Sequence, residues 1–188
     1  MSQELKTVVV MGTMDTKGRE LAYLAQRVRE AGCRALLMDV GAHAGSDVGA
    51  DIPADQIAAA AGEDIVLIRA LPRGEAVEKI SLAAATYLKQ MIEAREAHGV
   101  IGVGGSGGTT ICAAAMRGLP YGIPKLIVTT LASGNTRWHL DISDIILIPS
   151  LLDIGGLNPM LEMVLNNAAQ GIVGMVKGYR PYVASGKK

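Results

Sequence analysis

Short apolar runs alternate with longer segments of helical periodicity, and this alternation limits the fold more than any other feature. The runs are apolar enough for strands that are buried on both faces. Because parallel strands need long crossover connections, which are usually helices, the alternation predicts a doubly wound α/β domain, Rossmann-like or flavodoxin-like. Its mostly parallel sheet has about five strands, expected at residues 7–11, 35–38, 99–103, 124–129 and 145–148.

The helices are expected between these strands. An amphipathic helix starts at Lys17 and ends at Gly32, and a short Ala-rich helix follows Pro53. Longer apolar stripes predict a helix over 74–97, another over 111–116 and a last one that starts at Pro159.

The amino-acid composition excludes several classes of protein. The chain has 188 residues, which suits one domain, and its 49% hydrophobic content excludes disorder. Lys and Arg total 18, as do Asp and Glu, so the basic excess of a nucleic-acid binder is absent. The two cysteines are too far apart for a CxxC pair. No secretory signal and no bilayer-length apolar run is present, so we expect a cytoplasmic protein without a membrane partner.

The loop after the first expected strand combines a helix start with polar side chains. Sheets of this class bind ligands outside the carboxyl ends of their strands. Gly12, Thr13, Asp15, Thr16 and Lys17 lie in this loop, and free N–H groups, hydroxyls and a lysine are suited to phosphate. The spacing matches neither Walker A nor GxGxxG. The alternative is that Asp15 or Thr16 only caps the helix.

The loop after the third strand is the richest in glycine. Glycines there let a backbone approach a ligand closely, and successive N–H groups can form an anion-binding nest. The alternative is a tight turn that requires a positive φ, which one or two glycines would satisfy. The candidate phosphate-binding residues are Gly104, Gly105, Ser106, Gly107, Gly108, Thr109 and Thr110.

The ends of the fourth and second strands supply further candidates for ligand contacts. Thr130, Ser133 and Gly134 follow the fourth strand and either add hydrogen bonds to a ligand or form an ordinary polar loop. Asp39 ends the second strand, where an acidic residue often accepts from ribose hydroxyls. Its alternative role is to cap the turn at Gly41.

Other polar residues give weaker evidence for a functional site. His139, Asp141 and Asp144 have a spacing that a metal site can use, but a surface loop is the better interpretation. Asn166 and Asn167 interrupt an apolar helix, which indicates either a subunit contact or a buried hydrogen-bonded pair.

Four motifs in this order resemble the UPF0261 family, the Tm-1-like ATP-binding domain. They are GTMDTK, GVGGSGGTT, TTLASGNT and DIGGLNPMLEMVLNNAAQGIVGMV. The resemblance covers nearly the whole chain and implies an ATP-binding α/β domain that dimerises. The family's phosphate loops map onto Gly12 to Lys17 and Gly104 to Thr110. The family's second α/β domain is absent, so residues 1–188 are expected to form a single nucleotide-binding domain.

The leading hypothesis is therefore a module that binds ATP, with Mg²⁺ supplied by the nucleotide, and acts through dimerisation, a protein partner or a second domain. Lys17 would offset phosphate charge, Thr109 or Thr110 would reach phosphate or Mg²⁺, and Asp39 would bind the ribose. No general base adjoins a nucleophile, so no catalytic residue is assigned. One alternative is an enzyme for a phosphorylated or nucleotide-linked small molecule, with Asp15 and Lys17 as acid–base groups. An NAD(P)-dependent oxidoreductase is disfavoured by the lack of GxGxxG.

Overall fold

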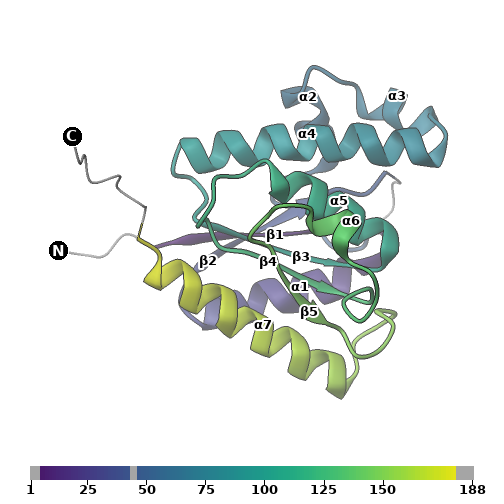
Figure 1. The fold of residues 1–188 in the computed structure, drawn as a ribbon. Helices are drawn as coiled ribbons and strands as arrows, with labels where there is room; N and C mark the ends of the chain where they lie inside the picture. The colour runs from purple at the N-terminus through teal and green to yellow at the C-terminus, as the bar shows by residue number, and fades with distance from the viewer. Residues whose placement is uncertain (1–4, 43–45, 181–188) are drawn as a thin grey trace, which may run out of the picture.

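The computed structural model describes residues 5–42 and 46–180 and contains a five-stranded parallel sheet (Figure 1). The strand order is β2-β1-β3-β4-β5, and every pairing is parallel. The doubly wound α/β prediction is confirmed. The strands are β1 (Thr7–Gly12), β2 (Arg34–Asp39), β3 (Gly99–Gly104), β4 (Lys125–Thr129) and β5 (Ile146–Pro149).

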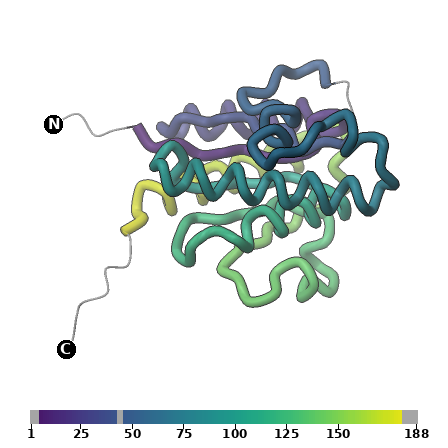
Figure 2. The backbone as a smooth tube through the Cα atoms, turned by 90° about the horizontal axis from the view of Figure 1, so that it is seen from above, coloured from purple at the N-terminus to yellow at the C-terminus, as the bar shows by residue number. Residues whose placement is uncertain are grey.

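Helices cover both faces of the sheet. One face carries α1 (Met14–Glu30) and α7 (Pro159–Gly178). The other carries α2 (Ala54–Ala60), α3 (Ile65–Ala70), α4 (Arg73–Glu93) and α5 (Ser106–Arg117). Figures 1 and 2 show α2 and α3 side by side with α4. A single turn, α6 (Arg137–Leu140), lies between β4 and β5. No helix of the described residues is long and apolar enough to cross a membrane.

The alternation of side chains along β1 divides the core in two. Val8 and Val10 lie in the cluster under α1 and α7, whereas Val9 and Met11 lie in the cluster under α4 and α5. All four are fully buried, because successive residues of a strand point to opposite faces. Small residues bring α5 close to the sheet: a Cβ on Gly102 would lie 2.7 Å from the Cys112 Sγ.

Two helices start earlier than the sequence pattern indicated, and two were missed. α1 begins at Met14, before a non-helical Lys17 (φ −130°, ψ 18°). α5 begins at Ser106 rather than at residue 111. Glycine is a poor helix former, so the pattern placed Gly107 and Gly108 in a loop, whereas they form the first turn of α5. The short helices α3 and α6 were not predicted.

The chain order places a crevice at the carboxyl ends of β1 and β3. After β1 the chain moves outward to β2, and then crosses to the other side of β1 to form β3. The loops that leave β1 and β3 therefore lead to helices on opposite faces. This reversal is the topological switch point, where doubly wound sheets bind ligands.

At the opposite end of the sheet, a buried lysine joins β4 to the segment before β5. Lys125 is 1% exposed, and its Nζ donates to the carbonyls of Pro120 and Ile123 at 2.9 and 3.0 Å. The Nζ also lies 2.8 Å from Asp144 Oδ1, while Asp144 Oδ2 accepts from the Gly122 N–H at 2.6 Å. Desolvation raises the pKa of Asp144, but Lys125 and the Gly122 N–H outweigh it and lower the pKa below its usual value.

Asp144 therefore has a structural role. Among the described residues, no group of three His, Cys, Asp or Glu side chains is placed to hold a metal ion. The interpretation of this segment as a surface loop agrees with the exposed Asp141 and Ile142, but His139 lies in the helical turn α6 and is half-buried.

We expect Asp144→Asn to destabilise the fold by about 1–3 kcal/mol at neutral pH, because it leaves the buried ammonium without its anion. Since the folded pKa of Asp144 is lowered, its contribution is present above the unfolded value of about 3.9 and is lost as pH falls through the folded value. Urea unfolding at several pH values measures this. Asp141→Asn is the control, and equal loss of stability in the two variants would contradict the assignment.

Candidate functional site

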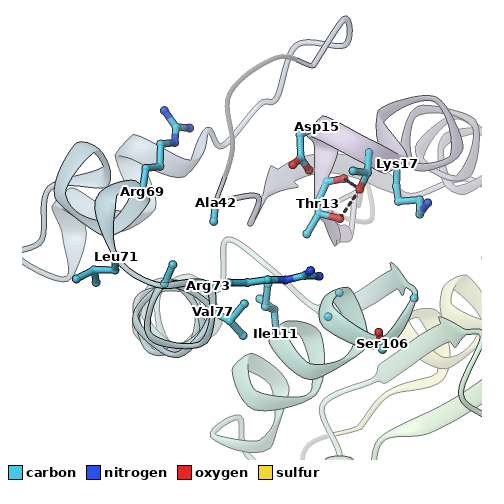
Figure 3. A pocket seen from close by; sticks show the side chains of 15 residues that line it. Thr13, Asp15, Lys17, Ala42, Arg69, Leu71, Arg73, Val77, Ser106 and Ile111 are labelled. Carbon is cyan, nitrogen blue, oxygen red and sulfur yellow. Dashed lines mark hydrogen bonds between the residues drawn. The ribbon is translucent and has the colours of Figure 1, made fainter.

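A cleft of about 350 Å³ opens at the switch point (Figure 3). Its walls come from the start of α1, the start of α5, and the segment from α3 to the start of α4. The structure thus brings together the loops after β1 and β3, as the sequence predicted. The predicted site residues that line the cleft are Thr13, Asp15, Thr16, Lys17, Gly105, Ser106, Gly107 and Gly108.

The start of α1 is capped from β2. Asp39 Oδ1 accepts from the N–H groups of Met14 at 3.0 Å and Gly41 at 2.8 Å. The alternative of Asp39 as a cap of the Gly41 turn is therefore confirmed, and the proposed cap by Asp15 or Thr16 is wrong, because neither is the N-cap residue. Asp39 is not among the residues that line the cleft.

The surroundings of Asp39 oppose its charged form. Desolvation raises the pKa of this carboxyl, and the charge of Asp15 adds to the rise. The Gly41 and Met14 N–H groups and the charge of Arg69 act in the opposite direction without cancelling it. The hydrogen bonds from the Met14 and Gly41 N–H groups therefore stabilise the charged form of Asp39 against desolvation.

Asp15 differs from Asp39 in that no described residue donates a hydrogen bond to its Oδ1. It lies in the first turn of α1 and lines the cleft. Its Oδ1 is buried and has no hydrogen-bond partner among the described residues. The neighbouring hydroxyls are paired with each other, since Thr13 Oγ1 and Thr16 Oγ1 are 3.0 Å apart. Within residues 5–42 and 46–180, this acceptor at the edge of the cleft is therefore unsatisfied.

The glycines at the end of β3 and the start of α5 allow close packing or leave space at the cleft. None of them is required for a positive φ. None of the four has a positive φ. A Cβ on Gly104 would lie 2.7 Å from the Gly108 C and the Thr109 N, so this position needs glycine for the turn into α5. A Cβ on Gly107 would meet nothing closer than Arg73 Nη2 at 3.7 Å. Gly107 therefore leaves open space at the cleft.

The two threonines of this loop do not line the cleft. Thr109 is fully buried, and its Oγ1 lies 2.6 Å from Thr129 Oγ1 and 3.2 Å from the Gly104 carbonyl. Thr110 Oγ1 donates to the Ser106 carbonyl at 2.9 Å. Both hydroxyls are engaged within the protein, and the Thr109 bond ties α5 to β4.

The remaining predicted residues lie elsewhere. Thr130 and Ser133 line a separate cleft of about 410 Å³ at the carboxyl ends of β4 and β5. Gly134 lines neither cleft, and its N–H donates to the Leu131 carbonyl at 3.0 Å. Gly12 ends β1, where a Cβ would lie 2.8 Å from the Val103 carbonyl oxygen, so it allows close packing.

Two arginines in the cleft were missed. Arg69 lies in the last turn of α3, and Arg73 is the first residue of α4. Figure 3 shows Arg73 reaching across the cleft between α4 and the start of α5. A signal was present, because a crossover helix runs antiparallel to its strands, so the start of α4 had to lie at their carboxyl ends.

The lining of the cleft combines cationic and apolar side chains. Among the described residues, no ion pair engages Lys17, Arg69 or Arg73. The apolar lining comes from Ala42, Leu71, Ala76, Val77 and Ile111. Unpaired cations beside helix starts favour an anionic ligand, and the apolar wall favours one that also has a nonpolar part.

Comparison with known proteins identifies the family of this chain. The N-terminal domain model of the uncharacterised protein family UPF0261 matches residues 6–181. The chain belongs to the UPF0261 family. A UPF0261 protein of Clostridium tetani is 38% identical over 94% of this chain and 44% of its own length. A UPF0261 protein of Mesorhizobium japonicum is 43% identical over 91% of this chain and 42% of its own.

A plant protein is also similar to this UPF0261 domain. The ToMV resistance protein Tm-1(GCR237) of Solanum lycopersicum is 36% identical over 91% of this chain and 25% of its own length. The chain spans less than half the length of each of these relatives.

We expect Gly104→Ala and Gly107→Ala to differ sharply in stability. The first forces a Cβ against backbone atoms at 2.7 Å, which should cost about 1–3 kcal/mol. The second adds a methyl group in open space on a helical turn, so stability should be unchanged or rise by up to about 1 kcal/mol. Denaturant unfolding compares the two. Equal losses would contradict the division of the glycines into packing and access positions.

Proposed function

We propose that this UPF0261 domain binds ATP in the cleft between β1 and β3, with the phosphates at the start of α5. The observation that carries the proposal is the convergence of Arg73 and the open first turn of α5 on one cleft at the switch point. Helix starts attract anions through free N–H groups and the helix dipole, and guanidinium groups bind phosphate in a bidentate manner.

The start of α5 is better suited to phosphate than the start of α1. The N–H of Met14 is bound by Asp39, and those of Thr16 and Lys17 donate to the Thr13 carbonyl. In α5 the first intrahelical bond comes from the Thr109 N–H to the Gly105 carbonyl. The preceding N–H groups, in the turn that starts at Ser106, have no helical partner. They are available to phosphate oxygens.

The rest of a nucleotide would lie along the apolar wall. Leu71, Val77 and Ile111 offer a nonpolar surface next to the cationic groups. Mg²⁺ would arrive with the phosphates, because the described residues provide no preformed metal-binding group. Lys17 would supply additional positive charge at the rim.

Binding without fast turnover fits this set of side chains better than catalysis. An acid–base pair of Asp15 and Lys17 would need the two groups to face one reacting atom. Figure 3 shows the Lys17 ammonium directed away from the Asp15 carboxylate. The enzyme alternative has no other observation in its favour.

Action through a dimer or another partner remains part of the proposal. Asn167 is exposed and Asn166 half-buried, so a buried pair is the wrong explanation for these asparagines. Met163 on the same helix is 53% exposed and Ile146 on β5 is 45% exposed. Exposed apolar groups on α7 and β5 support a subunit contact.

ATP should raise the melting temperature without rapid hydrolysis. Ligand at about 100 times its Kd adds ~2.7 kcal/mol, which corresponds to roughly 5–10 °C for a domain of this size. Arg73→Ala and Lys17→Ala should each reduce the shift and leave the ligand-free melting temperature nearly unchanged. Lys89→Ala, further along α4, is the control.

The measurement is a melting series with ATP, ADP and NADH beside a phosphate-release assay. The lack of a shift with every adenine nucleotide would overturn the proposal. Phosphate release well above ~1 per second, which is within the usual range of enzymes, would favour the enzyme alternative.

Gly107→Val should abolish ATP binding in a folded protein. The valine side chain would fill the space in front of the first turn of α5, where the nearest atom is now Arg73 Nη2. The stability cost should be below about 1 kcal/mol, since this φ is not positive. Calorimetric titration measures the affinity, and normal ATP affinity in the folded variant would place the phosphates elsewhere.

A further inference from the structure

Asp15 is the only carboxylate among the described residues that line the cleft. Its Oδ1 is buried, and no residue in the described part of the chain donates a hydrogen bond to it. We infer that Asp15 accepts a hydrogen bond from a ribose hydroxyl of the ligand, so that the site prefers ribonucleotides to deoxynucleotides. This inference rests on the proposed nucleotide binding. It assigns a binding residue to the sugar of the nucleotide, which the phosphate site does not contact.

Asp39, which ends β2, is engaged in hydrogen bonds within the protein. Its Oδ1 already accepts two N–H groups, which fix the start of α1 and the turn at Gly41. The sequence position that usually supplies the ribose acceptor is thus used for capping, and the neighbouring Asp15 is left with acceptor capacity.

Asp15 lies on the side of the cleft away from the phosphate site. A Cβ built on Gly41 would lie 3.1 Å from Asp15 Oδ1, so this oxygen faces the chain after β2. In Figure 3 Asp15 lies on the Ala42 side, Ser106 lies on the opposite side, and Arg73 extends between them. A ligand whose phosphates contact the start of α5 would present its sugar to Asp15.

Asp15 lines the cleft although its Oδ1 is buried, so a ligand hydroxyl would meet the other carboxylate oxygen. An ionised carboxylate can accept hydrogen bonds at both oxygens. The bond to a charged acceptor is among the stronger ones available to a ligand hydroxyl. Discrimination against an analogue that lacks the hydroxyl should therefore be large.

A cation is the less suitable occupant of this position. Lys17, Arg69 and Arg73 already line the cleft and would repel a second positive charge. Arg69 also acts electrostatically on Asp39. A hydroxyl needs only one acceptor, which Asp15 supplies.

The test measures the affinity of the full chain for ATP, 2′-deoxy-ATP, 3′-deoxy-ATP and inorganic tripolyphosphate, with and without Mg²⁺. The variants are Asp15→Ala and Asp15→Asn. Asp55→Asn is the matched control, because Asp55 occupies the first turn of α2 as Asp15 does that of α1. Melting temperatures establish that each variant is folded.

The wild-type protein should bind ATP roughly 10- to 100-fold more tightly than at least one deoxy analogue. Asp15→Ala should abolish that preference and should not weaken tripolyphosphate binding. Equal affinity of the wild type for all three nucleotides would overturn the inference. An equal loss for ATP, both analogues and tripolyphosphate that appears only with Mg²⁺ would assign Asp15 to a cation instead. Failure of the wild type to bind any of these compounds would overturn the nucleotide proposal itself.

Discussion

β1 forms parallel ladders with β2 on one side and β3 on the other, and the position of the site follows from this pairing. Met11 is in register with Met38 of β2 and Gly102 of β3, so three strands end at one level. The chain leaves β1 toward one face of the sheet and β3 toward the other. The starts of α1 and α5 then flank a crevice that side chains of the sheet cannot fill.

The starts of α1 and α5 differ in how their first N–H groups are satisfied. Asp39 satisfies the first N–H of α1 from the neighbouring strand, which fixes the loop after β1 without any ligand. No side chain of the described residues caps α5 in this way, because Gly105 has no side chain and the Thr109 hydroxyl is bonded to Thr129. The same arrangement therefore gives one rigid wall and one wall whose N–H groups are available to an anion. Arg73, carried in by the crossover helix, supplies a neutralising charge.

The sequence predicted all five strands, because each is a short apolar run bounded by glycine or polar residues, and the sheet order follows the usual rules for parallel crossovers. The sequence also indicated that the loops after β1 and β3 lie close together, because both follow parallel strands whose carboxyl ends meet at one edge of the sheet. It did not assign the start of α5, because the propensity of Gly107 and Gly108 opposes helix and only the tertiary contacts of Gly104 fix the turn. The sequence suggested Asp39 as a cap of the Gly41 turn, but its bond to the Met14 N–H joins two elements and no local pattern encodes it. The meeting of Arg69 and Arg73 with the start of α5 likewise depends on contacts between elements.

The proposed binding of phosphate groups at the start of α5, between β1 and β3, can be tested by titrating the ¹⁵N-labelled domain with Mg²⁺–ATP and following the amide chemical shifts. We expect the largest changes at Ser106, Gly107 and Gly108, with smaller ones near Thr13. Changes confined to the other cleft, around Thr130 and Ser150, would contradict it.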